Sequence, residues 1–394
     1  MAVNEKRINI SELDFDDIKD NLKVFLKGQT EFKDYDFEGS GMNILLDTLA
    51  YNTHYLSFNA NMLANEMFLD SASLRSSIVS HAKTLGYEVS SARSPTATIN
   101  IALATDSATK TMPAGTAFST TVDDVSYQFV TIADITGTNN GGSVPFDSTK
   151  IYEGTYVTTK YLVDNSDIEQ KYLLGDNRAD TSTLSVKVQT SATDSTTTTY
   201  TKATDISQLS STSTVYYLQE VDGGRFEVYF GDGVLSRSLS DGNIVILEYV
   251  VTNKTASNGA SIFSAPSLID GVSDITITTV TSASGGAEPE SLNSIKLQAP
   301  LDFASQGRAV TSDDYVVYTK KLFPNTQAVS VFGGEDGSFD PSLGVSSTPE
   351  YGKVFISIKS STGLNLSAAQ KSQLVNDFAK FKVASVTPVI VDPE

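Results

Sequence analysis

The first 94 residues carry the hydrophobic spacing of amphipathic helices. In residues 13–28, apolar positions recur three and four apart, at Phe15, Ile18, Leu22 and Phe25. This is the period of one helix face. Asp14 is placed to cap the start of the helix, and Gly28 is placed to end it. The pattern predicts an amphipathic helix with one apolar face.

A longer helix is predicted over residues 41–70, and it carries two apolar stripes. The first stripe contains Leu45, Leu49, Leu56, Leu63 and Met67, and the second contains Tyr51, Tyr55, Phe58 and Met62. A third helix is predicted over 74–86, ending at Gly86. An internal three-helix core would explain these stripes. Three helices rarely cover two faces of the middle one, so we expect part of this surface to pack against another subunit.

From Pro95 to about Ile277 the hydrophobic period changes from helical to two, which predicts strands. The clearest segments are residues 96–103, 183–190, 215–221, 225–230 and 244–251. Ser and Thr are densest in residues 191–214, a composition that favours exposed loops or edge strands over core. We expect this segment to be a solvated excursion from an all-β region.

After a small-residue stretch at 282–290 the chain returns to mixed structure. A helix is predicted to end near Pro300, and another is predicted to begin with Thr311 or Ser312 as its N-cap. Strands at 327–334 and 353–361, a helix at 367–382 and a strand at 386–391 complete an α-β-β-α-β order. That order is typical of a two-layer α/β domain. Because the chain stops just after this strand, we expect the natural protein to be longer.

The predicted fold class is therefore α+β and multidomain. It comprises an N-terminal helical bundle at 1–94, a central all-β domain at 95–285 and a C-terminal two-layer α/β domain at 286–394. The length of 394 residues agrees with two to four domains.

Charge and composition narrow the classes of partner. The net charge of −19 repels phosphate backbones, and no Lys/Arg stripe offsets it, so nucleic acid is not an expected partner. No apolar run approaches the roughly 18 residues that span a bilayer, and the N-terminus lacks a signal peptide's apolar region. We therefore expect a soluble protein made in the cytoplasm, without a membrane partner. With no cysteine, the chain has no thiolate nucleophile and no Cys-type zinc site.

The sequence shows no convincing catalytic constellation. Its two histidines, His54 and His81, lie in helical patterns without metal-ligand spacing, and no G-x-S-x-G elbow accompanies them. No P-loop or dinucleotide fingerprint is present. Carboxylate pairs are harder to exclude, but there is no tryptophan to serve as a sugar platform. We expect no catalytic residue, no cofactor and no metal.

Two acidic glycine turns interrupt the strand pattern in FGDGVLSRSLSDGN, residues 230–243. Asp232 and Asp241 are nine residues apart with apolar residues between them, which is too sparse for a calcium loop. Asp-Gly pairs are strong hairpin-turn signals, so a turn is the favoured interpretation. The acidic segment 333–340 has Glu335, Asp336 and Asp340 close together, so ion binding there is a second possibility. Calorimetry with calcium would test it, and the absence of heat would exclude it.

At this point several long motifs, in order, resemble a known family. Residues 37–87 look like the N-terminal signature of the baseplate wedge proteins of T-even-like contractile-tail bacteriophages, in the baseplate J-like family. VYFGDGVLSRSLSDGNIVILEY, GGAEPESLNSIKLQAPLDFASQGRAVTSDDY and PEYGKVFISIK agree with later parts of the family. The resemblance covers most of the chain.

The resemblance implies a structural protein of the virion tail baseplate, assembled in the host cytoplasm, and not an enzyme. It implies two copies per wedge, contacts with other wedge subunits and with neighbouring wedges, and a sixfold ring around the hub. The ring is implied to reorganise when sheath contraction is triggered.

Combining both lines, we expect partner contacts through Phe15, Ile18, Leu22 and Phe25 and through part of the Leu45–Met67 face. The region of Arg308, Thr311 and Asp314 is a hinge candidate. It is equally well interpreted as a capped helix start with Arg308 paired to a carboxylate.

Two functions from other classes stay open. The Ser/Thr-rich β region suggests a receptor- or glycan-binding tail module, which glycan-array binding by residues 95–285 would favour. A cell-wall glycosidase acting through a carboxylate pair would be indicated by release of reducing sugar from peptidoglycan. Neither explains the N-terminal helices.

Overall fold

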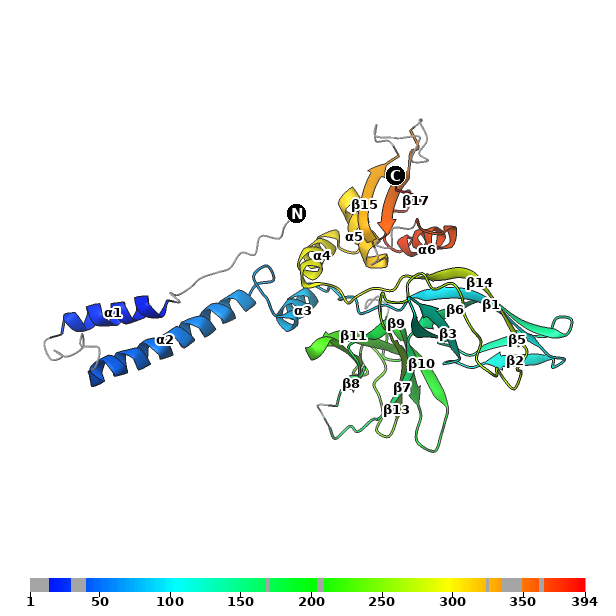
Figure 1. The fold of residues 1–394 in the computed structure, drawn as a ribbon, viewed down its shortest axis with the longest axis horizontal. Helices are drawn as coiled ribbons and strands as arrows, with labels where there is room; N and C mark the ends of the chain where they lie inside the picture. Colours follow the sequence, from blue (N-terminus) through cyan, green and yellow to red (C-terminus); the bar gives the residue numbers. More distant parts are fainter. Residues whose placement is uncertain are drawn as a thin grey trace. The chain divides into compact units, whose positions relative to one another are not determined.

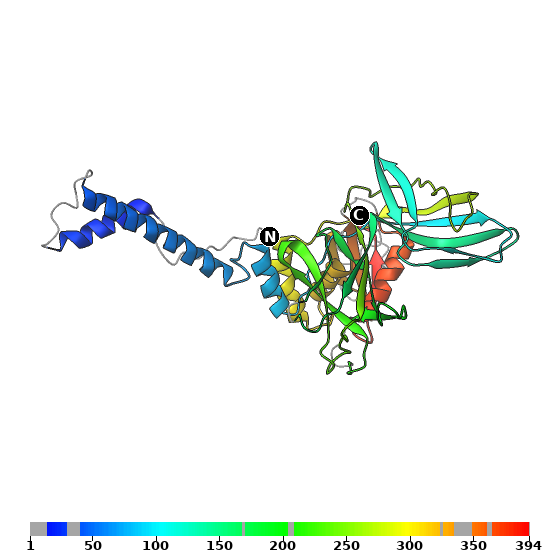
Figure 2. The same ribbon diagram turned by 90° about the horizontal axis from the view of Figure 1, so that it is seen from below.

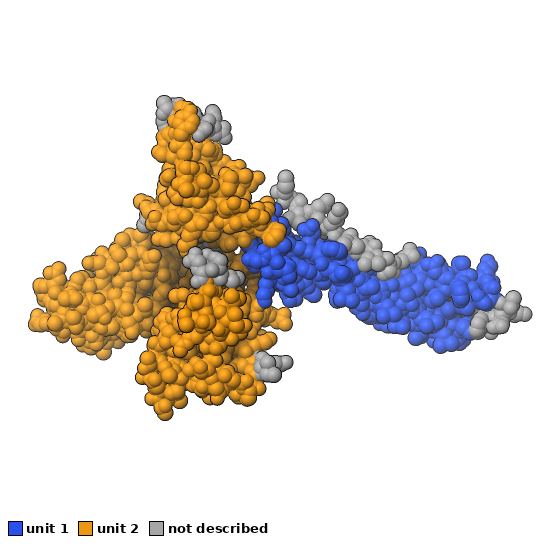
Figure 3. Space-filling view, turned by 180° about the vertical axis from the view of Figure 1, so that it is seen from behind, with its two compact units in different colours: residues 1–87, 292–300 blue, residues 88–291, 301–394 orange. Residues whose placement is uncertain are grey.

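The computed structural model describes residues 14–29, 40–167, 170–203, 209–323, 326–334, 349–360 and 365–393. Helices and several sheets are both present, so the predicted mixed α and β character is confirmed. The chain divides into two compact units, residues 1–87 with 292–300 and residues 88–291 with 301–394 (Figure 3). None of the helices in the described part of the chain combines the length and the apolar character needed to cross a membrane.

The first unit contains the three predicted N-terminal helices, α1 (Phe15–Lys27), α2 (Gly41–Glu66) and α3 (Arg75–Thr84). The Asp14 carboxylate accepts a hydrogen bond from the Asp16 backbone N–H at 2.8 Å, as its predicted capping role requires. Helix α1 runs alongside α2 (Figure 1, Figure 2).

A fourth helix, α4 (Leu292–Ser305), runs through Pro300, so the prediction that it ends near this proline is wrong. Proline removes one backbone donor and disfavours the helix, but a helix can continue through it with a local adjustment. Residues 292–300 belong to the first unit, where the Lys296 ammonium donates to the backbone oxygen of Asp70 at 3.0 Å.

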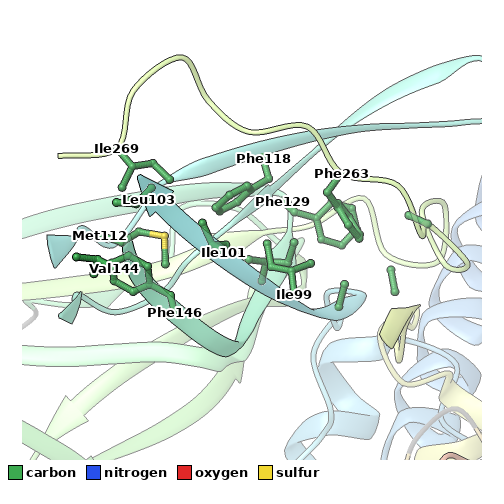
Figure 4. Close-up of a cluster of buried hydrophobic side chains, with 14 residues drawn as sticks. Ile99, Ile101, Leu103, Met112, Phe118, Phe129, Val144, Phe146, Phe263 and Ile269 are labelled. Atoms are coloured by element: carbon green, nitrogen blue, oxygen red, sulfur yellow. The ribbon is translucent and has the colours of Figure 1, made fainter. Parts of the chain in front are cut away.

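The second unit begins with a five-stranded antiparallel sheet in the order β14-β1-β6-β4-β3. Its strands are β1 (Thr96–Ala104), β3 (Ala117–Val122), β4 (Val125–Val130), β6 (Ser143–Glu153) and β14 (Ile275–Ser284). Alternate residues of β1 enter a buried cluster with phenylalanines from β3, β4 and the segment before β14 (Figure 4). A two-stranded ribbon of β2 (Thr109–Met112) and β5 (Ile135–Thr138) adjoins this sheet.

A second sheet has seven strands in the order β7-β13-β9-β10-β11-β12-β8. These are β7 (Thr155–Leu162), β8 (Tyr172–Leu173), β9 (Ala179–Gln189), β10 (Thr197–Lys202), β11 (Val215–Val221), β12 (Arg225–Phe230) and β13 (Ile244–Val251). It has a hydrophobic cluster of its own, which includes Val186, Tyr200, Phe226, Leu247 and Tyr249. The described part of the region expected to form one all-β domain thus holds two large sheets with separate cores, in addition to the β2–β5 ribbon.

The Ser/Thr-rich segment 191–214 is only partly a solvated excursion. Strand β10 lies inside the sheet, between β9 and β11, and Tyr200 is 4% exposed. The expectation of loops or edge strands is wrong for β10, because one aromatic residue faces the core between exposed threonines. Residues 204–208 lie outside the described residues.

The C-terminal part has the predicted α-β-β-α-β order. It consists of α5 (Ser312–Leu322), β15 (Thr326–Gly333), β16 (Lys353–Ser360), α6 (Ala368–Phe378) and β17 (Thr387–Val391). Strand β16 pairs antiparallel with β15 and parallel with β17. Tyr315, Tyr318 and Phe378 from the helices are buried together with Ile356 and Ile358 of β16. The acidic residues Glu335, Asp336 and Asp340 lie outside the described residues.

Candidate partner-binding face on the N-terminal helices

Helix α2 has an unusual surface because its 26 residues include only two charged side chains, Asp47 and Glu66. Both side chains bind partners within the first unit. Asp47 forms an ion pair with Lys19 of α1 at 2.5 Å, and Glu66 accepts hydrogen bonds at the start of α3. The remaining surface of α2 is therefore uncharged, which is uncommon for a solvated helix.

The contact between α1 and α2 buries little of either helix. Ile18 is the buried residue of α1, at 9% exposure, and Leu46 and Ala50 are buried on α2. The Lys19–Asp47 pair adds a surface contact of small energetic value. This contact occupies one side of α2 and leaves both predicted stripes outside it.

The first stripe of α2 is open along its whole length. Leu49, Leu56 and Leu63 are spaced by seven, as in helices that pack against one another over several turns. The exposed fractions are 58% for Leu45, 53% for Leu49, 61% for Leu56, 65% for Leu63 and 68% for Met67. Covering one such side chain fully would contribute roughly 1.5–3 kcal/mol.

The second stripe is aromatic and also open. Its exposed residues are Tyr51, Tyr55, Phe58 and Met62. The Tyr51 and Tyr55 hydroxyls are hydrogen-bonded to each other at 3.0 Å, and this bond raises the pKa of Tyr51. Rings with a polar tip on an otherwise apolar surface are typical of protein interfaces.

The predicted contact residues of α1 divide into three groups. Ile18 is buried, Phe15 and Leu22 are half-buried, and Phe25 is 66% exposed. Burial within the chain makes Ile18 part of the helix pair's own packing, whereas Phe25 stays open to a partner. The role of the whole set stays a prediction. Three further exposed apolar residues, Val24, Ile44 and Phe68, lie outside the predicted stripes, although their hydrophobicity alone would have indicated them.

The corner between α2 and α3 is held by reciprocal hydrogen bonds. The Glu66 carboxylate accepts from the Ser73 backbone N–H at 2.8 Å, the Ser73 hydroxyl at 2.7 Å and the Leu74 N–H at 3.3 Å. In return, His81 Nε2 lies 2.8 Å from the Glu66 backbone oxygen. Burial alone would raise the pKa of Glu66, but these hydrogen bonds and one from Ser77 together hold it below its usual value.

The hinge candidates form a helix start. The Thr311 hydroxyl accepts from the Asp314 N–H, and the Asp314 carboxylate accepts from the Thr311 N–H at 2.8 Å, which completes a capping box. Arg308 donates to the side-chain oxygen of Gln306 at 3.3 Å and makes no ion pair among the described residues. The described residues thus do not show the predicted pairing of Arg308 with a carboxylate, and the hinge role stays a prediction.

The two Asp-Gly sequences lie in a connection and not in a hairpin. Asp232 accepts from the Val234 N–H at 3.0 Å, and Asp241 accepts from the Asn165 N–H at 3.1 Å. Strands β12 and β13, which flank them, are not neighbours in the sheet. In the described part of the chain, no group of three His, Cys, Asp or Glu residues could hold a metal ion.

Comparison with known families places this surface in context. Residues 14–87 match the model "Baseplate wedge protein gp6-like, helical domain", which includes α1, α2 and α3. Residues 157–263 match "Bacteriophage baseplate wedge protein gp6, third domain", and residues 311–391 match "Baseplate structural protein gp6, C-terminal domain I". The chain belongs to the gp6-like family of phage baseplate wedge proteins. These are structural proteins of the virion tail baseplate and not enzymes.

The gp6-like chain is 30% identical over 408 residues to baseplate wedge protein gp6 of Enterobacteria phage T4. The match covers 96% of this chain and spans 58% of the length of that relative.

Two solved baseplate structures also match over most of the gp6-like chain. A chain of the anti-feeding prophage baseplate has 13% identity and a TM-score of 0.31. The match covers 96% of this chain and 70% of that chain. A chain of the type VI secretion system TssK-TssF-TssG baseplate subcomplex has 7% identity and a TM-score of 0.34. The match covers 89% of this chain and 96% of that chain.

Proposed function

We propose that this chain joins subunits of the baseplate wedge into a sixfold ring around the hub and takes part in the rearrangement that triggers sheath contraction. The observation that carries the proposal is the uncharged surface of α2, which leaves two apolar stripes exposed. The chain's membership of the wedge-protein family supports the proposal, because wedge proteins are parts of a multi-subunit assembly.

The parts of the chain would divide this work. Residues 1–94 would bundle with partner helices, residues 95–285 would act as a spacer, and residues 286–394 would contact neighbouring wedge subunits. The distribution of hydrophobic clusters supports the division. Both sheets and the C-terminal layer bury extensive clusters of their own, whereas α1 and α2 bury few residues.

The test replaces two residues of the first stripe by aspartate, as Leu56→Asp with Leu63→Asp. The matched control is Leu56→Met with Leu63→Met, which changes the same two positions of α2 but keeps them apolar and of similar volume. Association with co-produced wedge subunits is measured by light scattering after size-exclusion chromatography. The leucine variant should bind at least about 100-fold more weakly, because a buried unpaired carboxylate costs several kcal/mol.

The control variant should assemble like the original chain. Equal assembly of both variants would exclude the first stripe as an interface. A second pair, Leu22→Asp with Phe25→Asp, extends the test to α1 and should abolish association while both sheets remain folded. Association that survives this change would remove α1 from the interface.

A further inference from the structure

The seven-stranded sheet is an insertion in the five-stranded sheet. Strand β6 of the five-stranded sheet ends at Glu153, and β7 of the seven-stranded sheet begins at Thr155. After β13 ends at Val251, the chain returns to β14. Two short crossings, at Gly154 and after Val251, therefore connect the sheets.

A single buried carboxylate binds both crossings together. Glu153, at the end of the outgoing strand, is 0% exposed. Its carboxylate accepts three hydrogen bonds from the returning segment, from the Thr252 hydroxyl at 2.7 Å, the Asn253 N–H at 2.8 Å and the Asn253 side-chain amide at 2.8 Å. A buried carboxylate is tolerated only when its oxygens are satisfied in this way.

The backbone at the outgoing crossing leaves no room for adjustment. Gly154 has a φ of +127°, a conformation that other residues rarely adopt, and a Cβ there would lie 2.2 Å from the Val251 oxygen. The two crossings thus touch along their backbones, and Glu153 lies next to this contact.

A second buried carboxylate ties the seven-stranded sheet to the segment that enters β1. Asp180 of β9 is 1% exposed, and its carboxylate accepts from the Ser94 N–H at 2.7 Å and from the Ser182 N–H at 2.9 Å. Beside it, the Thr181 N–H donates to the Ser91 hydroxyl oxygen at 3.0 Å. The segment before β1 is therefore fixed to the inserted sheet at two adjacent positions.

We propose that Glu153 and Asp180 are positioning residues that hold the five-stranded and seven-stranded sheets at one angle, so that the β region moves as a single rigid body. Buried carboxylates add little net stability, but their hydrogen bonds are directional and admit few alternative geometries. Loss of one should therefore loosen the angle between the sheets more than it loosens either sheet.

The chain is well suited to a direct test because it contains no cysteine. Spin labels attached through Thr121→Cys in β3 and Thr199→Cys in β10, both exposed, report the distance between the sheets. In the full chain, Glu153→Gln and Asp180→Asn should each broaden the distance distribution roughly twofold, because an amide cannot accept at both former oxygen positions. Hydrogen exchange in β1 and β13 should stay at the level of the parent chain.

The matched control is Glu227→Gln, which changes a buried carboxylate inside the seven-stranded sheet, where it accepts from Gln219 at 2.9 Å. Its distance distribution should match that of the parent. If Glu153→Gln does not fold, Thr252→Val removes one donor without changing the charge and should still broaden the distribution. Unchanged widths in Thr252→Val and in every folded carboxylate variant, or equal broadening in the control, would overturn the proposal.

Discussion

Glu66 caps a helix to which it does not belong. The N-cap residue of α3 is Leu74, which has no side-chain capping bond, and Glu66 of α2 supplies the missing acceptor. Local caps such as Asp14 and Thr311 were predictable because cap and helix are adjacent in sequence. The Glu66 cap was not, because it depends on the tertiary turn that brings the end of α2 to the start of α3.

This cap makes the α2–α3 corner sensitive to acid. The native pKa of Glu66 is below the usual value of 4.5, so its carboxylate stabilises the corner above pH 4.5 and loses that effect as the pH falls through the native pKa. At pH 7, Glu66→Gln should lower the local stability of α3 by about 1 kcal/mol. Hydrogen exchange of α3 amides measures this. If the destabilisation of α3 by Glu66→Gln grew as the pH was lowered, the predicted direction of the pH dependence would be contradicted.

The hairpin between β3 and β4 provides a second prediction at this scale. Asp123 and Asp124 form its two-residue turn, with φ values of 49° and 62°. Glycine at the second position suits such a turn better than aspartate, so Asp124→Gly should raise local stability by about 0.5–1 kcal/mol. Exchange of β3 and β4 amides would slow. The control Ser126→Gly, in the β4 strand, should speed it, and similar acceleration by both would refute the turn argument.

At the element scale, α5 shows which hinge candidates matter for the local fold. Thr311→Ala removes the capping hydroxyl and should lower the local stability of α5 by about 1 kcal/mol, or roughly fivefold in amide exchange. Arg308→Glu should change it by less than about 0.5 kcal/mol, because among the described residues the guanidinium is hydrogen-bonded to the Gln306 side chain alone. Equal effects of both changes would argue against the capping box as the stabilising feature.

Periodicity predicted the existence of elements better than their surroundings. The stripes of α2 and the limits of β11, β12 and β13 follow from residue spacing alone. Spacing does not state what covers a stripe, and only the structure shows that α1 takes neither stripe. Similarly, α4 continues past Pro300 and β10 enters the sheet through Tyr200, because tertiary contacts override local composition.

At the scale of the whole molecule, the insertion of one sheet into another could not be predicted from the sequence. Strands β6 and β7 are separated by one residue, yet they belong to different sheets, and β1 pairs with β14 almost two hundred residues away. Alternating patterns identify strands but carry no information on their partners. Long motifs were informative where local patterns were not, and they indicated the baseplate wedge family.

We propose that the exposed stripes of α2 become covered when the baseplate assembles. Because the chain has no native cysteine, Leu56→Cys and Leu63→Cys can be labelled with a thiol reagent, with Thr199→Cys on the exposed surface of β10 as a control that should label quickly in both states. We expect fast labelling of both leucine positions in the free chain and strong protection in assembled baseplates. Equally fast labelling in both states, in variants that assemble normally, would contradict it.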